Sequence, residues 1–255
     1  MSLSFKRAAV LLAALAGGAA YPVGAQPQPQ PAPPSVANRA LVFIDPAHGG
    51  PETGATLVDN ALEKNVTLAL ANQLRTALTE AGFTVVSTRD GDLTEPLTTD
   101  QRAEIANRSH AIACLVLHAT GTGSGVHVYT TTLQPLPAQA AGTEEFVPVL
   151  WDSAQVEYAG QSLRLSGDVM SALKKANLPA ISGAAAVRPL DNLMCPALAI
   201  EIAPLAISGS TTTPVTSTSY QQRVAALVAG ALKDWRDHAE PPAGPTKKLS
   251  AGAQP

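Results

Sequence analysis

Aromatic residues are scarce in this chain: Phe, Trp and Tyr together make up 4% of its 255 residues. Hydrophobic residues still account for 45% of the chain, so its core must be aliphatic. A chain of this length predicts one folded domain of ordinary size with accessory segments. Dense basic runs are also missing, and the net charge is −3. We therefore expect no nucleic-acid partner, because phosphate binding needs clustered Lys and Arg.

Cysteine is nearly absent as well. The two cysteines, Cys114 and Cys195, are too few for a disulfide framework. Cys114 lies inside the apolar run ACLVLH, and Cys195 comes just before the apolar run PALAIEI. These surroundings favour two buried thiols, and a single bridge between them is the alternative in an oxidising compartment.

The first 25 residues have the pattern of a secretory signal peptide. Lys6 and Arg7 precede the run AAVLLAALAGGAA, which is too short to span a bilayer comfortably, and small residues at 23–25 offer a cleavage site. We expect an exported protein of the periplasm or cell envelope. Its membrane association would occur only through this segment, if the segment stays uncleaved.

Two proline-rich segments flank the part of the chain that should fold. Residues 26–37 form a Pro/Gln-rich linker and residues 239–255 a tail expected to be disordered, because neither has the means to form a core. The folded catalytic domain is expected at residues 38–238. Within it, the long connection 131–158 predicts either a regulatory or lid element beside a groove or an idle surface excursion.

Strands alternate with helices along the expected domain. Short apolar runs predict buried strands, and apolar residues at helical spacing predict amphipathic helices. The expected strands cover residues 40–45, 83–89, 111–118, 125–131 and 196–202, and the expected helices 61–78, 98–107, 159–176 and 220–235. This alternation is typical of an α/β sandwich with a largely parallel central sheet flanked by helices. In such sheets, ligands bind at the carboxyl ends of the strands.

Two histidines fall at such strand ends. His48 follows the first strand in the stretch DPAHGG, and His118 ends the run ACLVLH. Each histidine taken alone is as consistent with a structural role as with a functional one. Glu63, near a helix start, can be explained by the favourable interaction of an acidic residue with the helix dipole. Together they form a His/Glu/His set, the ligands that a catalytic zinc ion takes while a fourth position stays open. Calcium or magnesium sites would be built from oxygens.

Glu201 lies in the apolar run PALAIEI, where both faces of a strand should be covered. An unpaired buried carboxylate is costly, so Glu201 should be protonated, paired or close to a metal. A surface position on an edge strand is the alternative. Zinc lowers the pKa of its water to about 7. Glu201 would then be the general base that takes the water proton and passes it to a leaving amine.

The chain resembles the zinc-dependent N-acetylmuramoyl-L-alanine amidases of the amidase-3 type. The resemblance covers nearly all of residues 40–235 and is carried by LVFIDPAHGG, ALEKNVTLALANQLRTALTEAGFTVVSTRDGD, TTDQRAEIANRSHAIACLVLHAT, GVHVY and CPALAIEIAPL. It implies that His48, Glu63 and His118 are the zinc ligands. It also implies that Glu201 is the catalytic acid/base and that Arg102 is structural.

The resemblance further implies a substrate and a reaction. The protein would hydrolyse the amide bond between N-acetylmuramic acid and L-alanine in peptidoglycan, acting on muropeptides, with an activator protein as a candidate partner. Three departures from the family pattern affect the expected groove and rate more than the reaction. Ala47 stands where the family usually has glycine, Thr120 where it has asparagine, and Ala203-Pro204 where it has Gly-Phe.

Two alternatives remain open. One is a catalytically impaired peptidoglycan-binding protein on the same fold, which predicts a missing ligand or base. The other is a zinc peptidase that acts on another amide and shares the chemistry.

Overall fold

The computed structural model describes residues 40–134, 150–206 and 211–238. Three segments predicted from the sequence lie outside these residues: the signal peptide (1–25), the linker (26–37) and the tail (239–255). Residues 135–149 of the 131–158 connection lie outside them too. In the described part of the chain, no helix combines the length and the apolar character that crossing a membrane requires.

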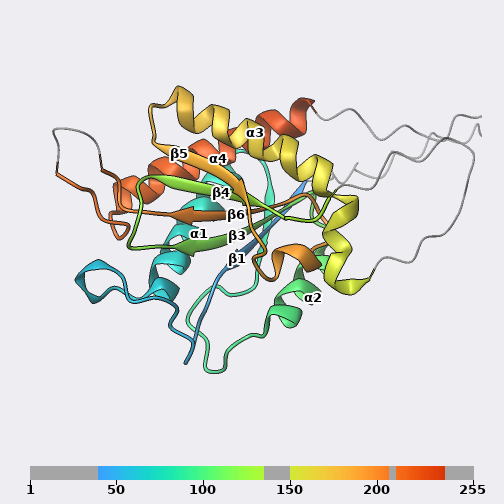
Figure 1. Ribbon diagram of the computed structural model, residues 1–255, viewed down its shortest axis with the longest axis horizontal. Coiled ribbons are helices and arrows are strands. Elements are labelled where there is room, and N and C mark those ends of the chain that lie inside the picture. Colours follow the sequence, from blue (N-terminus) through green and yellow to red (C-terminus); the bar gives the residue numbers. More distant parts are fainter. Residues whose placement is uncertain (1–39, 135–149, 207–210, 239–255) are drawn as a thin grey trace, which may run out of the picture. The chain divides into compact units, whose positions relative to one another are not determined.

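Within the described residues, six strands form one sheet in the order β2-β1-β3-β6-β4-β5 (Figure 1). In chain order they are β1 (Leu41–Pro46), β2 (Thr84–Ser87), β3 (Ala113–Ala119), β4 (Val126–Thr130), β5 (Ala180–Ala184) and β6 (Ala197–Ile202). Strands β2, β1, β3 and β6 run parallel to one another, whereas β4 is antiparallel to β6, and β5 is parallel to β4. The predicted α/β fold with a largely parallel sheet is confirmed.

Helices cover both faces of this sheet (Figure 1). One face carries α1 (Glu63–Glu80), α3 (Ala159–Lys175) and α4 (Thr218–His238), and α4 packs against both of the others. The opposite face carries α2 (Thr99–Ser109) together with the short 3₁₀ helix η3 (Leu190–Asn192). Two further 3₁₀ helices are η1 (Val58–Asn60), just before α1, and η2 (Trp151–Glu157), just before α3.

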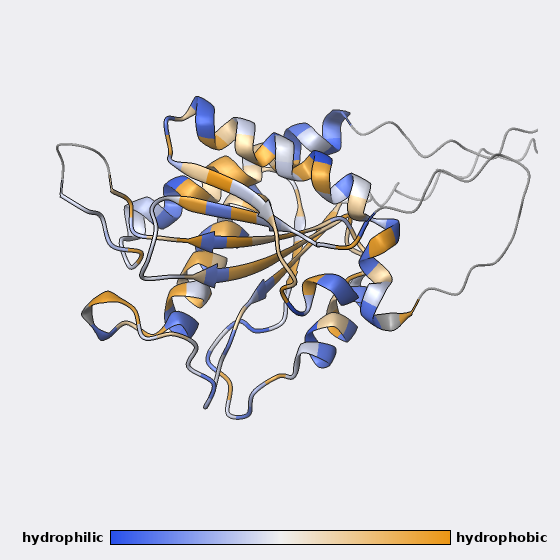
Figure 2. Ribbon diagram, viewed as in Figure 1, coloured by the Kyte–Doolittle hydropathy of each residue, from blue (hydrophilic) through white to orange (hydrophobic). Residues whose placement is uncertain are grey.

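Apolar side chains of the central strands alternate between two cores. Val42 and Ile44 of β1 pack on the side of α1, α3 and α4, whereas Phe43 of β1 and Cys114 and Val116 of β3 pack on the side of α2. Figure 2 shows largely apolar strands between helices that carry both polar and apolar residues. Because both faces of these strands are buried, their sequences consist of continuous apolar runs.

Most predicted elements are present, with ends that differ by a few residues. Helix α2 begins with a capping box at Thr98: the Gln101 N–H donates to Thr98 Oγ1, and the Thr98 N–H donates to Gln101 Oε1. Helix α1 begins at Glu63, two residues later than predicted. The sequence does not predict β5, because its residues AISGA lie largely exposed at the sheet edge and show no apolar run.

Cys114 and Cys195 form a disulfide. The prediction of two free thiols is therefore wrong, although both residues are buried as expected. The pairing follows from the register of β3 on β6, which sets Cys114 opposite Ala197, two residues beyond Cys195. Local sequence patterns do not carry that register. The bridge ties the strand that carries His118 to the segment that leads into β6.

Loss of this bridge is expected to destabilise the fold. We expect the free energy of unfolding of the Cys114→Ala/Cys195→Ala double variant to be about 2–5 kcal/mol lower than that of the wild type. The bridge spans a sequence separation of 81 residues and restricts the unfolded chain. Denaturant titrations of the variant and the wild type measure the difference, and wild-type protein unfolded with a reductant should match the variant. Equal midpoints for oxidised wild type and double variant would contradict the expectation.

Candidate functional site

The four predicted site residues meet at one edge of the sheet. His48 follows β1, His118 lies at the penultimate position of β3, and Glu201 lies at the penultimate position of β6. Since β1, β3 and β6 are parallel, their carboxyl ends share this edge. Glu63 is the first residue of α1, which begins at the same edge because it follows β1. This is where α/β sheets bind their ligands.

Glu63 lies between the two histidines. Its Oε1 is 3.0 Å from His118 Nδ1, and its Oε2 is 3.1 Å from His48 Nε2. One ligand atom from each of the three residues lies within 4.8 Å of those of the other two. Two imidazoles and a carboxylate, converging in this way, form a donor set suited to zinc.

An unpaired nitrogen at this cluster points to a ligand. His118 Nε2 is buried, and no residue that the structure describes gives it a hydrogen bond. A buried polar atom without a partner is costly and rare in native proteins. A bound cation would account for both this nitrogen and the convergence of the three side chains, so the residues present fit a zinc ion.

Glu63 and His48 shift each other's protonation. The hydrogen bond to Glu63 raises the pKa of His48, against the opposing effect of burial, and Glu52 raises it further. Burial alone would raise the pKa of Glu63, but hydrogen bonds from His118, His48 and the Ala55 N–H outweigh it and hold that pKa well below its ordinary value. Glu63 is therefore charged at neutral pH and attracts a cation.

The turn that presents His48 has left-handed backbone. The φ angles are 65° at His48, 137° at Gly49 and 60° at Gly50. A Cβ on Gly50 would lie 2.7 Å from the carbonyl oxygen of Leu93, so this position requires glycine. Ala47 is outside the positive-φ region. The backbone conformation of Ala47 therefore does not need the glycine that the family usually has there.

Two buried arginines stabilise this turn by donating hydrogen bonds to its backbone carbonyls. Arg102 Nη1 lies 2.7 Å from Asp45 Oδ1, and Arg102 Nη2 donates to the carbonyl of His48 at 2.9 Å. Arg89 donates to the carbonyls of Pro46 and Ala47. These contacts agree with the structural role implied for Arg102. Arg89 is not singled out by the sequence, because it ends an expected strand among polar residues.

Glu201 is less enclosed than its apolar strand predicts, since its side chain is 27% exposed. Its neighbour on β3 is His118, and its neighbour on β4 is His127. Glu201 is paired, as a partly buried carboxylate should be: its Oε2 lies 2.7 Å from His127 Nδ1. The sequence assigns no role to His127, because this contact depends on the antiparallel pairing of β4 with β6.

Glu52 is a second residue that sequence reasoning missed. Its Oε1 lies 3.1 Å from Nδ1 of His48, the ring nitrogen that does not face Glu63. Histidines that bind metals usually donate their second nitrogen to a carboxylate or carbonyl, which fixes the ring. The separation of four residues is the signal that could have identified Glu52, once the tight turn at His48 is known.

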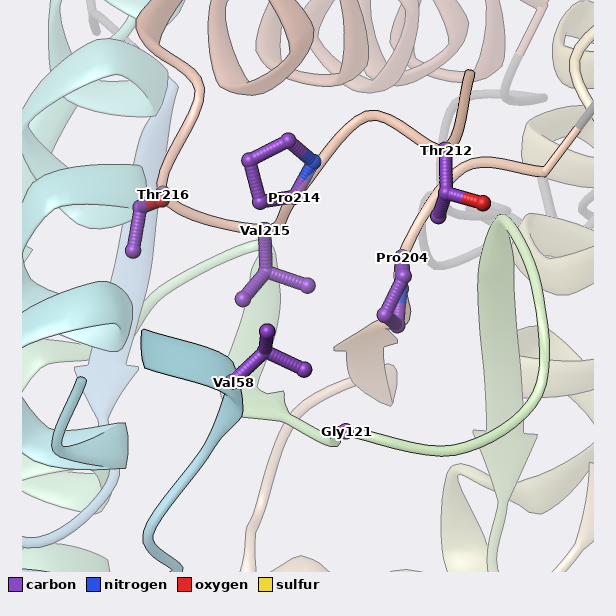
Figure 3. A pocket seen from close by; sticks show the side chains of 7 residues that line it. All are labelled: Val58, Gly121, Pro204, Thr212, Pro214, Val215 and Thr216. Carbon is purple, nitrogen blue, oxygen red and sulfur yellow. The ribbon is translucent and has the colours of Figure 1, made fainter. Parts of the chain in front are cut away.

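An apolar pocket opens at the same edge of the sheet (Figure 3). Its lining consists of Val58, Gly121, Pro204, Thr212, Pro214, Val215 and Thr216. Gly121 comes three residues after His118, and Pro204 comes three residues after Glu201. The four predicted site residues do not line the pocket, but the loops that leave their strands do. Pro204, one of the departures from the family pattern, therefore lies in a pocket wall.

One known protein family matches most of the described residues, and curated relatives match about a third of the chain. The Amidase_3 family, described as N-acetylmuramoyl-L-alanine amidase, matches residues 42–234. The N-acetylmuramoyl-L-alanine amidase AmiA of Salmonella typhimurium is 39% identical over 84 residues, which cover 33% of this chain and 28% of that protein. AmiC of Neisseria meningitidis is 33% identical over 101 residues, 37% of this chain and 24% of that protein. The matches thus span less than a third of these curated relatives.

Solved structures share the fold. Ami1 from Mycobacterium smegmatis superposes with a TM-score of 0.60 at 20% identity, covering 78% of this chain and 97% of that one. An N-acetylmuramoyl-L-alanine amidase from Clostridium difficile 630 gives 0.56 at 22% identity, covering 80% and 100%. The CwlD amidase from Clostridioides difficile, in complex with the GerS lipoprotein, gives 0.54 at 18% identity, covering 78% and 98%.

Proposed function

The chain belongs to the N-acetylmuramoyl-L-alanine amidase family, and on that premise we propose that it is an exported zinc amidase of peptidoglycan. It hydrolyses the amide bond between the lactyl group of N-acetylmuramic acid and L-alanine. The observation that carries the proposal is the cluster of His48, Glu63 and His118 beside Glu201. The pattern of residues 1–25 supports export to the periplasm or cell envelope.

We assign zinc binding to His48, Glu63 and His118. When bound, zinc supplies a water of lowered pKa and polarises the carbonyl oxygen of the scissile amide. The charge that Glu63 keeps at neutral pH and the unpaired Nε2 of His118 both support this assignment. Glu52 holds the second nitrogen of His48 and so fixes its ring.

Glu201 is the general base and acid in this proposal. It lies beside His118 in the register of β3 and β6, and its partial exposure lets water and substrate reach the carboxylate. Glu201 takes the proton of the attacking water and delivers it to the nitrogen of L-alanine as the amide bond breaks. The products are a muramic acid with a free lactyl carboxylate and a stem peptide with a free amino terminus.

The surroundings of the site suggest what else it contacts. The apolar pocket between Val58, Pro204 and Val215 is a candidate subsite for the methyl groups of the lactyl moiety and of L-alanine (Figure 3). An activator protein is a candidate partner. Supporting this, the CwlD amidase, which shares the fold, was solved in complex with the GerS lipoprotein.

Incubation of the purified protein with muropeptides tests the proposal. With zinc, we expect mass spectrometry to find free stem peptides that begin with L-alanine. A chelator should abolish their release, and added zinc should restore it. Muropeptides that are bound but left intact by the zinc-loaded protein would favour the peptidoglycan-binding alternative. Cleavage inside the stem peptide would favour the zinc peptidase.

A further inference from the structure

We propose that His127 is a positioning residue that holds one oxygen of the Glu201 carboxylate, so that the other oxygen faces the water and the scissile amide. This inference rests on the proposed function for its role in catalysis. The contact between His127 and Glu201 is a feature of the folded protein and can be tested without measuring amidase activity.

The sheet register places His127 beside the proposed base. Glu201 on β6 is the register partner of His118 on β3 and of His127 on β4. Side chains at paired positions of neighbouring strands project from the same face of the sheet. The three residues therefore form one row across the sheet, with Glu201 between a proposed zinc ligand and His127.

The contact between His127 and Glu201 is short and sheltered. Nδ1 of His127 lies 2.7 Å from Oε2 of Glu201, within the range of hydrogen bonds to charged groups. The His127 side chain is 9% exposed, whereas that of Glu201 is 27% exposed. The imidazole is thus almost fully enclosed, whereas part of the carboxylate is open to solvent. An enclosed hydrogen bond is electrostatically stronger than one in water.

Neighbouring groups fix the orientation of the His127 ring. A Cβ on Gly123 would lie 2.8 Å from Cε1 and 3.0 Å from Nε2 of His127, and the φ of Gly123 is +81°. The glycine lets the loop after β3 pass directly against the ring edge. On another side, the Tyr129 ring lies edge-on at 6.4 Å between centroids, with an interplanar angle of 75°. Because the ring is held in place, it can in turn hold Glu201.

A held carboxylate has a kinetic advantage over a free one. Glutamate has several side-chain torsions, and ordering them during the reaction would add to the barrier. Donation from Nδ1 to Oε2 occupies one oxygen and leaves Oε1 as the base. The proton of the attacking water goes to Oε1 and then to the leaving nitrogen, and His127 keeps its own proton throughout. We expect the contact to contribute roughly 10–100-fold to kcat, the range found for groups that orient the ligands of a metal.

Two variants separate positioning from simple packing. The side-chain nitrogen of asparagine can occupy the place of Nδ1, so His127→Asn keeps a donor to Glu201, whereas His127→Leu removes it. We expect His127→Leu to lower kcat roughly 10–100-fold with KM nearly unchanged, and His127→Asn to recover most of the loss. Zinc content should equal that of the wild type in both. His238→Asn, at an exposed position near the end of α4, is the matched control and should behave as the wild type.

Nitrogen NMR of the imidazoles provides a readout that does not need amidase activity. In the wild type we expect the neutral His127 ring to carry its proton on Nδ1, and Glu201→Leu should remove that preference. A proton on Nε2 in the wild type would overturn the inference. Equal losses of kcat in His127→Asn and His127→Leu, or a loss confined to KM, would overturn it as well. An inactive wild type that shows the Nδ1 proton would refute the proposed function while leaving the contact confirmed.

Discussion

Glu201→Gln is expected to lower kcat for muropeptide cleavage by roughly 10²–10⁴-fold, the contribution typical of a general acid–base group. Glutamine has the same shape and can still accept the hydrogen bond from His127 through its amide oxygen. It cannot take a proton from water at neutral pH, so the chemical step loses its base. Zinc content should match that of the wild type, because Glu201 is not among the three clustered residues.

Single-turnover rates and zinc content, measured on the same preparations, check this expectation. Glu80→Gln is the matched control, since Glu80 is an exposed glutamate at the end of α1 and its loss should leave both quantities unchanged. A Glu201→Gln variant that retains most of the wild-type rate would show that another group is the base. A variant that loses its zinc would instead place Glu201 in the metal site.

Glu63→Gln is expected to abolish both zinc binding at physiological concentrations and activity. The substitution removes the negative charge between His48 and His118, and that charge is what attracts a cation to the cluster. Glutamine can still receive the hydrogen bond from the Ala119 N–H, so the variant should fold. Zinc affinity should fall by more than the roughly 10–100-fold that follows loss of a residue outside the ligand set.

Glu52→Gln provides the graded comparison. Glu52 contacts His48 from the side away from Glu63, so its substitution should weaken zinc binding by roughly 10–100-fold and leave activity recoverable with excess zinc. Competition with a chromophoric chelator measures the zinc affinities of the wild type, Glu63→Gln and Glu52→Gln. If Glu63→Gln binds zinc as tightly as the wild type, or if Glu52→Gln has the larger effect, the assigned ligand set is wrong.

The fold could be predicted where burial leaves a local pattern. The run ACLVLH predicts a strand because both faces of that strand are buried and its residues are therefore apolar. The apolar runs of β1 and β6 predict strands for the same reason. β5 could not be predicted because it lies exposed at the edge. The bond between Cys114 and Cys195 depends on the register of β3 and β6, which no local pattern records.

The site divides in the same way. His48, His118 and Glu201 could be proposed because each falls near the carboxyl end of a recognisable strand, and such ends meet at one edge of a parallel sheet. The contact of His127 could not be predicted, because it depends on the antiparallel pairing of β4 with β6, which local sequence patterns do not reveal. The prediction that both faces of the strand are covered at Glu201 is wrong, because it takes no account of where along the strand Glu201 lies. Its strand is buried along most of its length, but Glu201 lies at the open edge, one residue before β6 ends.

Hydrolysis of a defined muropeptide in ¹⁸O-labelled water tests the central claim most directly. The zinc-loaded protein should release a stem peptide with a free amino group on L-alanine and place one ¹⁸O atom in the lactyl carboxylate of the muramic acid. After chelation, neither product should form. Label in a carboxylate of the stem peptide, or release that continues without metal, would contradict the assignment of this protein as a zinc amidase of the muramoyl–alanine bond.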